Sequence, residues 1–505
     1  MSNANLFDLF ATRFPKEANA PCLYLPDGSI WTYDDLNRTA ARLANLLIQL
    51  GLQPGDRVAV QVDKTAEALA LYLASLRAGT VFLPINPAYQ RHELDYFLND
   101  ATPGLFVCAP EQLALATELA QGAGTPHVLT LDDTGHGSLM DAAADLPDTF
   151  ATIPRNKDDL AAILYTSGTT GRSKGAMLTH GNLAANVTTL HTAWHFQPND
   201  VLLHMLPIFH IHGLFVACHC MLLNGSSMYF EPKFDPKRAI ELLPKSTVFM
   251  GVPTYYTRLL ANEAFTREIA ASIRLFISGS APLLKETFTQ FTERTGHTIL
   301  ERYGMSEGGM FTSNPYLGER RGGTVGQPLP CTQVRVFNDD GLPCATGEVG
   351  HIQVKGDNVF AGYWRMPEKT REEFTADGWF KTGDMGSWSD DGYLSISGRS
   401  KDLIITGGLN VYPKEIEELI DALPGVVESA VIGLPHADFG EAVTAVVVRD
   451  TSAAGAALSP ADIIATLKAT LANFKVPKAV HLVDDLPRNT MGKVQKNVLR
   501  QQFGG

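Results

Sequence analysis

The sequence predicts an α/β protein. A large N-terminal domain of layered mixed and parallel sheets and helices, with a β-rich subdomain, precedes a small α+β C-terminal domain. Short apolar segments alternate with helical patterns over about the first 320 residues, which is typical of layered α/β folds. Short strands and frequent glycines follow, and a new strand–helix pattern begins near residue 400. We therefore expect domains at residues 1–400 and 401–505.

Buried strands are expected where apolar and β-branched residues run together between helical segments. The clearest such segments are residues 56–62, 105–108, 160–165, 246–250 and 273–278. Between the first two, the segment that starts at Thr65 is apolar with a helical period, and Gly79 closes it as a C-cap. This alternation of strands and helices favours mainly parallel sheets covered by helices.

The chain changes character after about residue 320. Residues 333–337 and 351–355 are predicted strands that follow one another without helices, which indicates the β-rich subdomain. In the last unit, residues 412–420 form a predicted helix with Pro413 near its start. Two strands within 426–448 and a helix over 460–473 follow, and residues 453–457 are expected to be a surface loop.

Composition excludes several classes of function. The chain has 505 residues, of which 45% are apolar and 19% are charged, as in globular proteins. Its formal net charge of −13 argues against nucleic acid or an anionic membrane as the main partner. Six scattered cysteines, no export signal and no run of 18 apolar residues predict a reduced, cytoplasmic protein.

A loop rich in glycine and hydroxyl residues follows the predicted strand at 160–165. Glycines let backbone N–H groups converge on an anion, and hydroxyls and a cation surround them. The pattern is not that of a P-loop, because no Gly-Lys-Ser/Thr end is present. We expect it to bind a triphosphate through Thr166, Ser167, Gly168, Thr169, Thr170, Gly171 and Lys174.

Four further segments carry chemistry. Residues 278–282 and 301–307 are expected at strand ends, where α/β folds bind ligands; Tyr303 suits an adenine ring and Glu307 a Mg²⁺ ion. Asp384 can accept hydrogen bonds from a ribose diol, and Arg399 can donate to the same hydroxyls or to a phosphate. Lys493 lies beside a glycine in a turn, which by itself is weak evidence.

In this order and at these intervals, the five segments resemble the acyl- and aryl-CoA synthetases of the adenylate-forming superfamily, over essentially the whole chain. The resemblance implies two half-reactions that use ATP, Mg²⁺ and CoA. The substrate carboxylate first attacks the α-phosphorus of MgATP, which gives acyl-AMP and pyrophosphate. The CoA thiol then displaces AMP, after the C-terminal domain has rotated about a hinge.

The resemblance also implies roles for individual residues. Lys493 is the adenylation lysine and a target for a lysine acetyltransferase and deacetylase, Lys401 is the hinge, and His210 is a second catalytic candidate that gates the acyl pocket. The implied metal site is Thr166 with Glu307, and the CoA site is Gly407, Gly408 and Leu409. The implied ATP site adds Gly279, Ser280, Ala281, Glu301, Arg302, Tyr303, Gly304, Met305, Ser306, Asp384 and Arg399 to the loop. The His-Ile-His pattern at 210–212 indicates a metal site only weakly, because no clustered carboxylate accompanies it.

Two arginines in the predicted walls of the acyl pocket indicate the substrate. These walls are residues 251–258, 278–281 and 302–310, and they contain Arg258 and Arg302, with Ser280 in place of a small apolar residue. Arginine captures a carboxylate through two parallel hydrogen bonds. This combination resembles the malonyl-CoA synthetases of the superfamily and predicts a malonate site of Arg258, Arg302, Ser280 and His210, with methylmalonate as a second candidate substrate.

Two alternatives remain open. If Arg258 faces outward and Arg302 bonds only to backbone, the chain is a short- or medium-chain monocarboxylate–CoA ligase of the same superfamily. A catalytically inactive nucleotide-binding scaffold is the alternative from another class, and the presence of both Lys493 and Glu307 argues against it.

Overall fold

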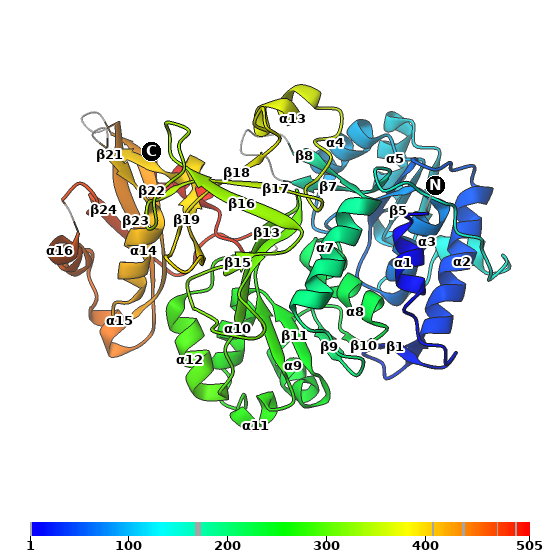
Figure 1. Cartoon of the computed structure of the whole chain (residues 1–505), viewed down its shortest axis with the longest axis horizontal. Coiled ribbons are helices and arrows are strands. Elements are labelled where there is room, and N and C mark those ends of the chain that lie inside the picture. Colours follow the sequence, from blue (N-terminus) through cyan, green and yellow to red (C-terminus); the bar gives the residue numbers. More distant parts are fainter. Residues whose placement is uncertain are drawn as a thin grey trace.

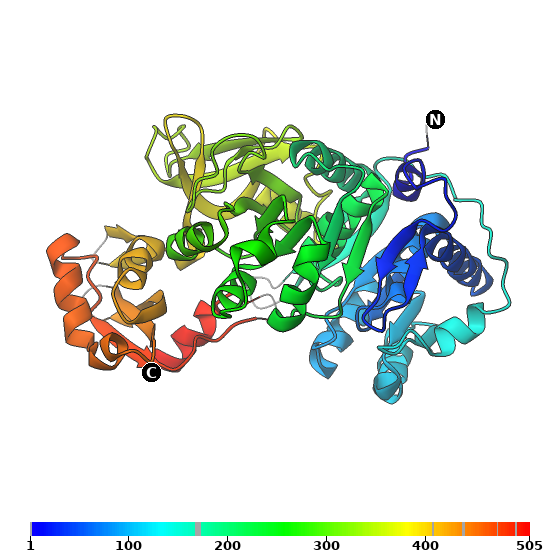
Figure 2. The same cartoon turned by 90° about the horizontal axis from the view of Figure 1, so that it is seen from below.

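The structure is a computed structural model that describes residues 3–166, 173–406, 409–436, 440–471, 473–489 and 492–504. These residues form four sheets: two large ones with helices packed on them, a small antiparallel sheet and a C-terminal sheet. Figures 1 and 2 show an elongated molecule with the C-terminal part at one end. The α/β class predicted from the sequence is confirmed.

The first large sheet lies in the N-terminal third of the chain. Over the described residues its strand order is β6-β5-β3-β4-β7-β8, and only β7 and β8 pair in the antiparallel direction. Its strands are β3 (Arg57–Gln61), β4 (Val81–Pro84), β5 (Leu105–Cys108), β6 (His127–Thr130), β7 (Leu160–Thr166) and β8 (Lys174–Thr179). Its helices are α2 (Tyr33–Gln49), α3 (Ala66–Ala78), α4 (Arg91–Ala101), α5 (Leu113–Ala123) and α6 (Ser138–Ala143).

The second large sheet is mixed. Its order is β15-β14-β13-β12-β11-β9-β10-β1-β2, with parallel pairing from β1 to β13 and antiparallel strands at both edges, among the residues that the structure describes. Its strands are β1 (Pro21–Tyr24), β2 (Ile30–Thr32), β9 (Val201–His204), β10 (Ser227–Phe230), β11 (Val248–Gly251), β12 (Leu275–Ser278), β13 (Leu300–Met305), β14 (Gly309–Ser313) and β15 (Gln327–Pro328). The accompanying helices are α1 (Leu6–Ala11), α7 (His180–Ala193), α8 (His219–Asn224), α9 (Pro236–Leu242), α10 (Pro253–Leu260), α11 (Arg267–Ala270) and α12 (Lys285–Thr295), with a π-helix at His212–Cys218.

The predicted β-rich subdomain is an antiparallel sheet of β16 (Thr332–Phe337), β17 (Gly350–Gly356), β18 (Phe380–Trp388) and β19 (Leu394–Arg399). The two predicted strands, β16 and β17, follow one another without a helix as expected, whereas α13 (Pro367–Glu373), which the sequence did not predict, lies between β17 and β18. This short helix begins at a proline and buries none of its residues, so no apolar period marks it in the sequence.

The C-terminal part has its own sheet and apolar core. The sheet contains β20 (Ile404–Thr406), β21 (Leu409–Val411), β22 (Val426–His436), β23 (Gly440–Arg449) and β24 (Ala479–Val483), and its helices are α14 (Pro413–Asp421), α15 (Ala453–Ala457), α16 (Pro460–Thr470) and α17 (Lys496–Phe503). Ile404, Ile416 and Val431 are fully buried in its core. Residues 453–457 form a helix instead of the expected loop, because Ser452 caps it and alanine favours helix. The boundary at 400/401 stays a prediction.

The described part of the chain contains no helix that is both long and apolar enough to cross a bilayer.

Candidate active site

Three predicted nucleotide-binding side chains meet where β18 and β19 lie beside β13. The register of β18 and β19 places Asp384 opposite Arg399, whose Nε donates to Oδ1 of Asp384 at 2.9 Å. Tyr303 on β13 donates its hydroxyl to the other carboxylate oxygen at 2.6 Å. Burial and the adjacent Asp384 charge raise the pKa of Tyr303 well above 10, so this hydroxyl stays a donor. Asp384 is therefore held in one orientation by two neighbours.

The predicted metal carboxylate lies close to this group. Glu307 is buried, and its Oε1 accepts a hydrogen bond from the Tyr363 hydroxyl at 3.0 Å. Burial raises the pKa of Glu307, whereas the Tyr363 hydrogen bond and the positive charges of Arg399 and Lys174 act in the opposite direction. Among the described residues, no three His, Cys, Asp or Glu side chains cluster as metal ligands. One buried carboxylate fits Mg²⁺, which commonly binds through one or two carboxylates together with substrate phosphates.

Part of the predicted triphosphate loop can be placed. Thr166 at the end of β7 lies opposite Lys174 at the start of β8, and the Tyr96 hydroxyl donates to the Ser173 carbonyl at 2.7 Å. Lys174 is nearly buried and points toward Tyr363, with its ammonium 4.4 Å from the ring centre. The remaining predicted loop residues, Ser167, Gly168, Thr169, Thr170 and Gly171, lie outside the described residues.

The hairpin that carries Lys493 reaches from the C-terminal part to α10, and Figure 2 shows this red segment beside the green elements. A Cβ atom placed on Gly492 would lie 3.3 Å from Oγ1 of Thr254 at the start of α10. Asn489 fixes the backbone of the hairpin, because its side-chain oxygen accepts from the Lys493 amide at 2.9 Å. Lys493 keeps an exposed surface, but burial of its ammonium group and the positive charge of Arg399 lower its pKa to about 8. The structure thus brings Lys493 toward the group formed by Asp384 and Arg399.

The two predicted substrate arginines lie in different environments. Arg302 on β13 is 5% exposed, and its Nε and Nη2 have no hydrogen-bond partner among the described residues. Its guanidinium lies against Gly279, where a Cβ atom would be 2.2 Å from Cζ, so only glycine leaves room for it. Burial lowers the pKa of Arg302 to about 9, and the group is still charged at neutral pH. Arg258, in contrast, is exposed on α10.

Two histidines face the Arg302 charge. Burial and then Arg302 lower the pKa of His210 to about 4 and that of His212 well below 6.5, so both rings are neutral at pH 7. Nδ1 of His212 lies 3.3 Å from the Ser280 hydroxyl, and Ser280 has a left-handed backbone with φ of +72°. From the sequence, His212 is a candidate only for the weak metal site; the structure places it beside Ser280 of the predicted acyl pocket.

Other predicted residues lie farther from this centre. Glu301 accepts a hydrogen bond from the Gly323 amide at 3.1 Å. Burial raises the pKa of Glu301 to about 8, and the cation near it is Lys414. Glu301 therefore lies apart from the group that contains Asp384 and Lys174. Leu409 is 49% exposed on β21, while Gly407 and Gly408 lie outside the described residues. Lys401 lies in the turn between β19 and β20, where burial lowers its pKa. Ala281, Gly304, Met305 and Ser306 are partly exposed beside the Arg302 and Tyr303 positions.

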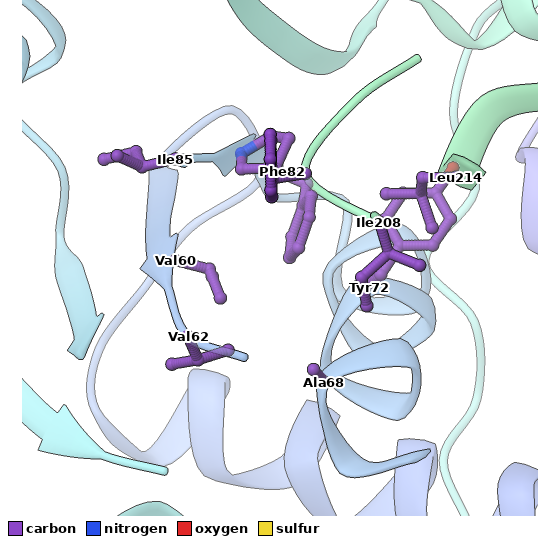
Figure 3. A pocket seen from close by; sticks show the side chains of 10 residues that line it. Val60, Val62, Ala68, Tyr72, Phe82, Ile85, Ile208 and Leu214 are labelled. Carbon is purple, nitrogen blue, oxygen red and sulfur yellow. The ribbon is translucent and has the colours of Figure 1, made fainter. Parts of the chain in front are cut away.

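A small apolar cavity of about 20 Å³ lies next to the segment that leads to His210 (Figure 3). It is lined by side chains of β3, α3, β4 and the segment 208–214, which include Val60, Ala68, Phe82, Ile208 and Leu214. It contains no cation, so a second carboxylate would have no partner there. Within the described residues of the predicted acyl-pocket walls, Arg302 is the buried arginine, whereas Arg258 is exposed.

Comparison with known proteins finds matches to both the N-terminal and the C-terminal part of the chain. The AMP-binding enzyme family matches residues 9–364, and the AMP-binding enzyme C-terminal domain matches residues 415–493. A malonate–CoA ligase of Arabidopsis thaliana is 34% identical, with 99% of this chain and 90% of the relative covered. A feruloyl-CoA synthase of an Amycolatopsis species is 36% identical, with 94% and 95% covered.

Among solved structures, ATP-bound MatB from Rhodopseudomonas palustris is 55% identical and has a TM-score of 0.97, with 100% of this chain and 99% of that chain covered. The apo form of the same protein has a lower TM-score of 0.86, again with 100% of this chain and 99% of that chain covered. The arrangement of this chain is thus more similar to the ATP-bound form.

Proposed function

Because this chain belongs to the AMP-binding enzyme family, we propose that it is an ATP-dependent malonate–CoA ligase. In the first half-reaction it forms malonyl-AMP and pyrophosphate, and in the second it forms malonyl-CoA and AMP. The observation that carries the choice of substrate is the buried Arg302 guanidinium, whose Nε and Nη2 have no partner among the described residues. The malonate–CoA ligase relative supports the same substrate, and the ATP-bound MatB structure supports the use of ATP.

A buried charge without a partner is costly, so a site that contains one is suited to a ligand that supplies the opposite charge. Malonate has a second carboxylate, whose two oxygens match two adjacent N–H donors of a guanidinium. His210 and His212 are neutral and add no competing charge. A monocarboxylate such as butyrate would leave the Arg302 donors unpaired, and the pocket should discriminate against it.

The first half-reaction requires the reacting carboxylate and the α-phosphate to be held together. We assign this role to Lys493, whose ammonium stabilises the negative charge that develops between the two groups. Asp384 accepts from the ribose hydroxyls while Arg399 and Tyr303 keep it in place. Lys174 and Arg399 face the phosphates, and Glu307 with Thr166 would hold Mg²⁺, which neutralises phosphate charge when bound.

The second half-reaction and its control rest on the C-terminal part. We propose Lys401 as the hinge and the β20–β21 segment, with Leu409, as part of the CoA site. We further propose that acetylation of Lys493 switches the enzyme off, because it removes the charge needed for adenylation. Full acetylation of Lys493 without loss of activity would reject this regulation. The cytoplasmic location stays a prediction from composition.

The test of the function is a ligase assay with CoA and ATP in which AMP formation is measured for acetate, butyrate, benzoate, malonate, methylmalonate and succinate. We expect the highest kcat/KM with malonate, followed by methylmalonate. A preference for butyrate would establish the monocarboxylate alternative instead. An absence of AMP with every acid would support the inactive scaffold.

A further inference from the structure

Lys174 has a carboxylate partner that the proposed reaction does not use. Its Nζ lies 3.5 Å from Oε1 of Glu373, the last residue of α13, and 4.4 Å from the centre of the Tyr363 ring. The Tyr363 hydroxyl in turn donates to Glu307 at 3.0 Å. Glu373, Lys174, Tyr363 and Glu307 therefore form one continuous series of contacts that ends at the predicted metal carboxylate.

The Glu373–Lys174 pair is shielded but not sealed from water. The Lys174 side chain is 12% exposed and that of Glu373 is 24% exposed. Glu373 also lies 3.1 Å from Nζ of Lys369, one turn earlier on α13. Glu373 would thus keep one cation after losing Lys174, which makes the Lys174 contact exchangeable.

A polyphosphate that approaches Lys174 must compete with this carboxylate. The same ammonium cannot give its full charge and all of its donors to Glu373 and to a phosphate at once. We propose that Glu373 is the counter-ion that Lys174 exchanges for the phosphates of ATP. Glu373 holds Lys174 over the Tyr363 ring before ATP binds, and it takes Lys174 back when pyrophosphate leaves. This inference rests on the phosphate-binding role proposed for Lys174.

The exchange has a direct consequence for affinity. Part of the binding free energy of the phosphates is used to break the Glu373 ion pair, so Glu373 weakens ATP and pyrophosphate binding and speeds product release. Ion pairs that are partly open to water contribute modestly, which corresponds to about two- to fivefold in a dissociation constant. The difference should shrink at high salt, which screens charges that are accessible to water.

The experiment compares the full-length wild type with Glu373→Gln and with Glu368→Gln as a matched control. Glu368 lies on the same helix, is 86% exposed and pairs with Arg371, so its loss changes the net charge equally without involving Lys174. Binding of a non-hydrolysable ATP analogue is measured by calorimetry, and inhibition by pyrophosphate is measured in the ligase assay. We expect Glu373→Gln to bind both anions about two- to fivefold more tightly, with Glu368→Gln unchanged.

A double-mutant cycle with Lys174→Gln shows whether Glu373 acts through Lys174. In the Lys174→Gln background, Glu373→Gln should no longer tighten binding. Tightening that persists there would mean that Glu373 repels phosphate directly, which overturns the exchange. Unchanged or weaker binding by the single variant Glu373→Gln also overturns it. If Lys174→Gln alone binds the analogue normally, the role of Lys174 fails and the inference fails with it, whereas a preference for malonate would still stand.

Discussion

Replacement of Arg302 by Met tests whether this buried guanidinium selects a dicarboxylate. Methionine keeps most of the side-chain volume and removes the charge and its donors. Loss of one partner of a desolvated, hydrogen-bonded charge pair costs about 2–5 kcal/mol, which is about 30-fold to several-thousand-fold in binding. Because Arg302 is 5% exposed, the loss should lie in the upper part of that range. We expect kcat/KM for malonate to fall at least about a hundredfold, while activity with butyrate is kept or improved.

The assay measures AMP formation with malonate, methylmalonate and butyrate for Arg302→Met and for Arg258→Met. Arg258 is the matched control, because it is an arginine of the same predicted pocket that the structure leaves exposed on α10. From the sequence alone, Arg258 is the stronger candidate, because Arg302 adjoins the adenine segment and is needed there to hold Tyr303; the geometry favours Arg302 instead. Thermal unfolding without substrate should show no loss of stability in Arg302→Met. The variant removes a buried charge whose Nε and Nη2 have no partner among the residues that the structure describes.

Two results would refute this reasoning. If Arg302→Met keeps malonate activity near that of the wild type, the buried guanidinium does not bind the second carboxylate. If Arg258→Met loses a hundredfold and Arg302→Met does not, the substrate arginine is the exposed one, and the pocket must rearrange when malonate binds.

Three further predictions concern the C-terminal part. Lys493→Ala should lower malonyl-AMP formation by roughly 10²–10³-fold and still convert supplied malonyl-AMP and CoA to the thioester; equal loss in both steps would contradict its role. Lys401→Pro fixes φ near −65° and should do the reverse, so an unchanged overall rate would place the hinge elsewhere. Since the pKa of Lys493 is lowered to about 8 by burial and by Arg399, its ammonium is present below this pH and is lost above it. Single-turnover adenylation should therefore fall as the pH rises through about 8, and Lys493→Arg should lack this decrease because arginine stays charged; a wild-type rate that is flat to high pH would contradict the assignment.

Local signals in the sequence were enough to predict where many helices begin and end. The helix α3 begins after Thr65, whose side chain accepts from the Ala68 amide, and ends at Gly79 with φ of +71°. Both features depend on neighbours within one turn, so they can be read without knowledge of the fold. The same holds for Pro413 at the start of α14. The helix α13 was missed because its sequence shows no apolar period, and α15 was missed because five residues are too few to show a helical period.

The sequence also identified which segments carry chemistry, but it could not assign every side chain to a partner. Tyr303 was expected to support an adenine ring, and the structure shows its hydroxyl bonded to Asp384. The pairing of Asp384 with Arg399 depends on the register of β18 and β19, which two separated segments do not reveal. Residues 167–171 and 407–408 lie outside the described residues, so those predictions stay untested.

By itself, the sequence determined the fold class, the order of its segments and the family to which they belong, because these depend on residue type, period and spacing along the chain. Only the tertiary structure decided that Arg302 is buried, with its Nε and Nη2 unpaired among the described residues, while Arg258 is exposed. It also decided that Lys174 meets Glu373, 199 residues farther along the chain. The physical reason is that burial and pairing of a charge depend on which distant elements pack around it. Two arginines that look equivalent in a sequence therefore differ by the solvation of their guanidinium groups, and that difference selects the proposed substrate site.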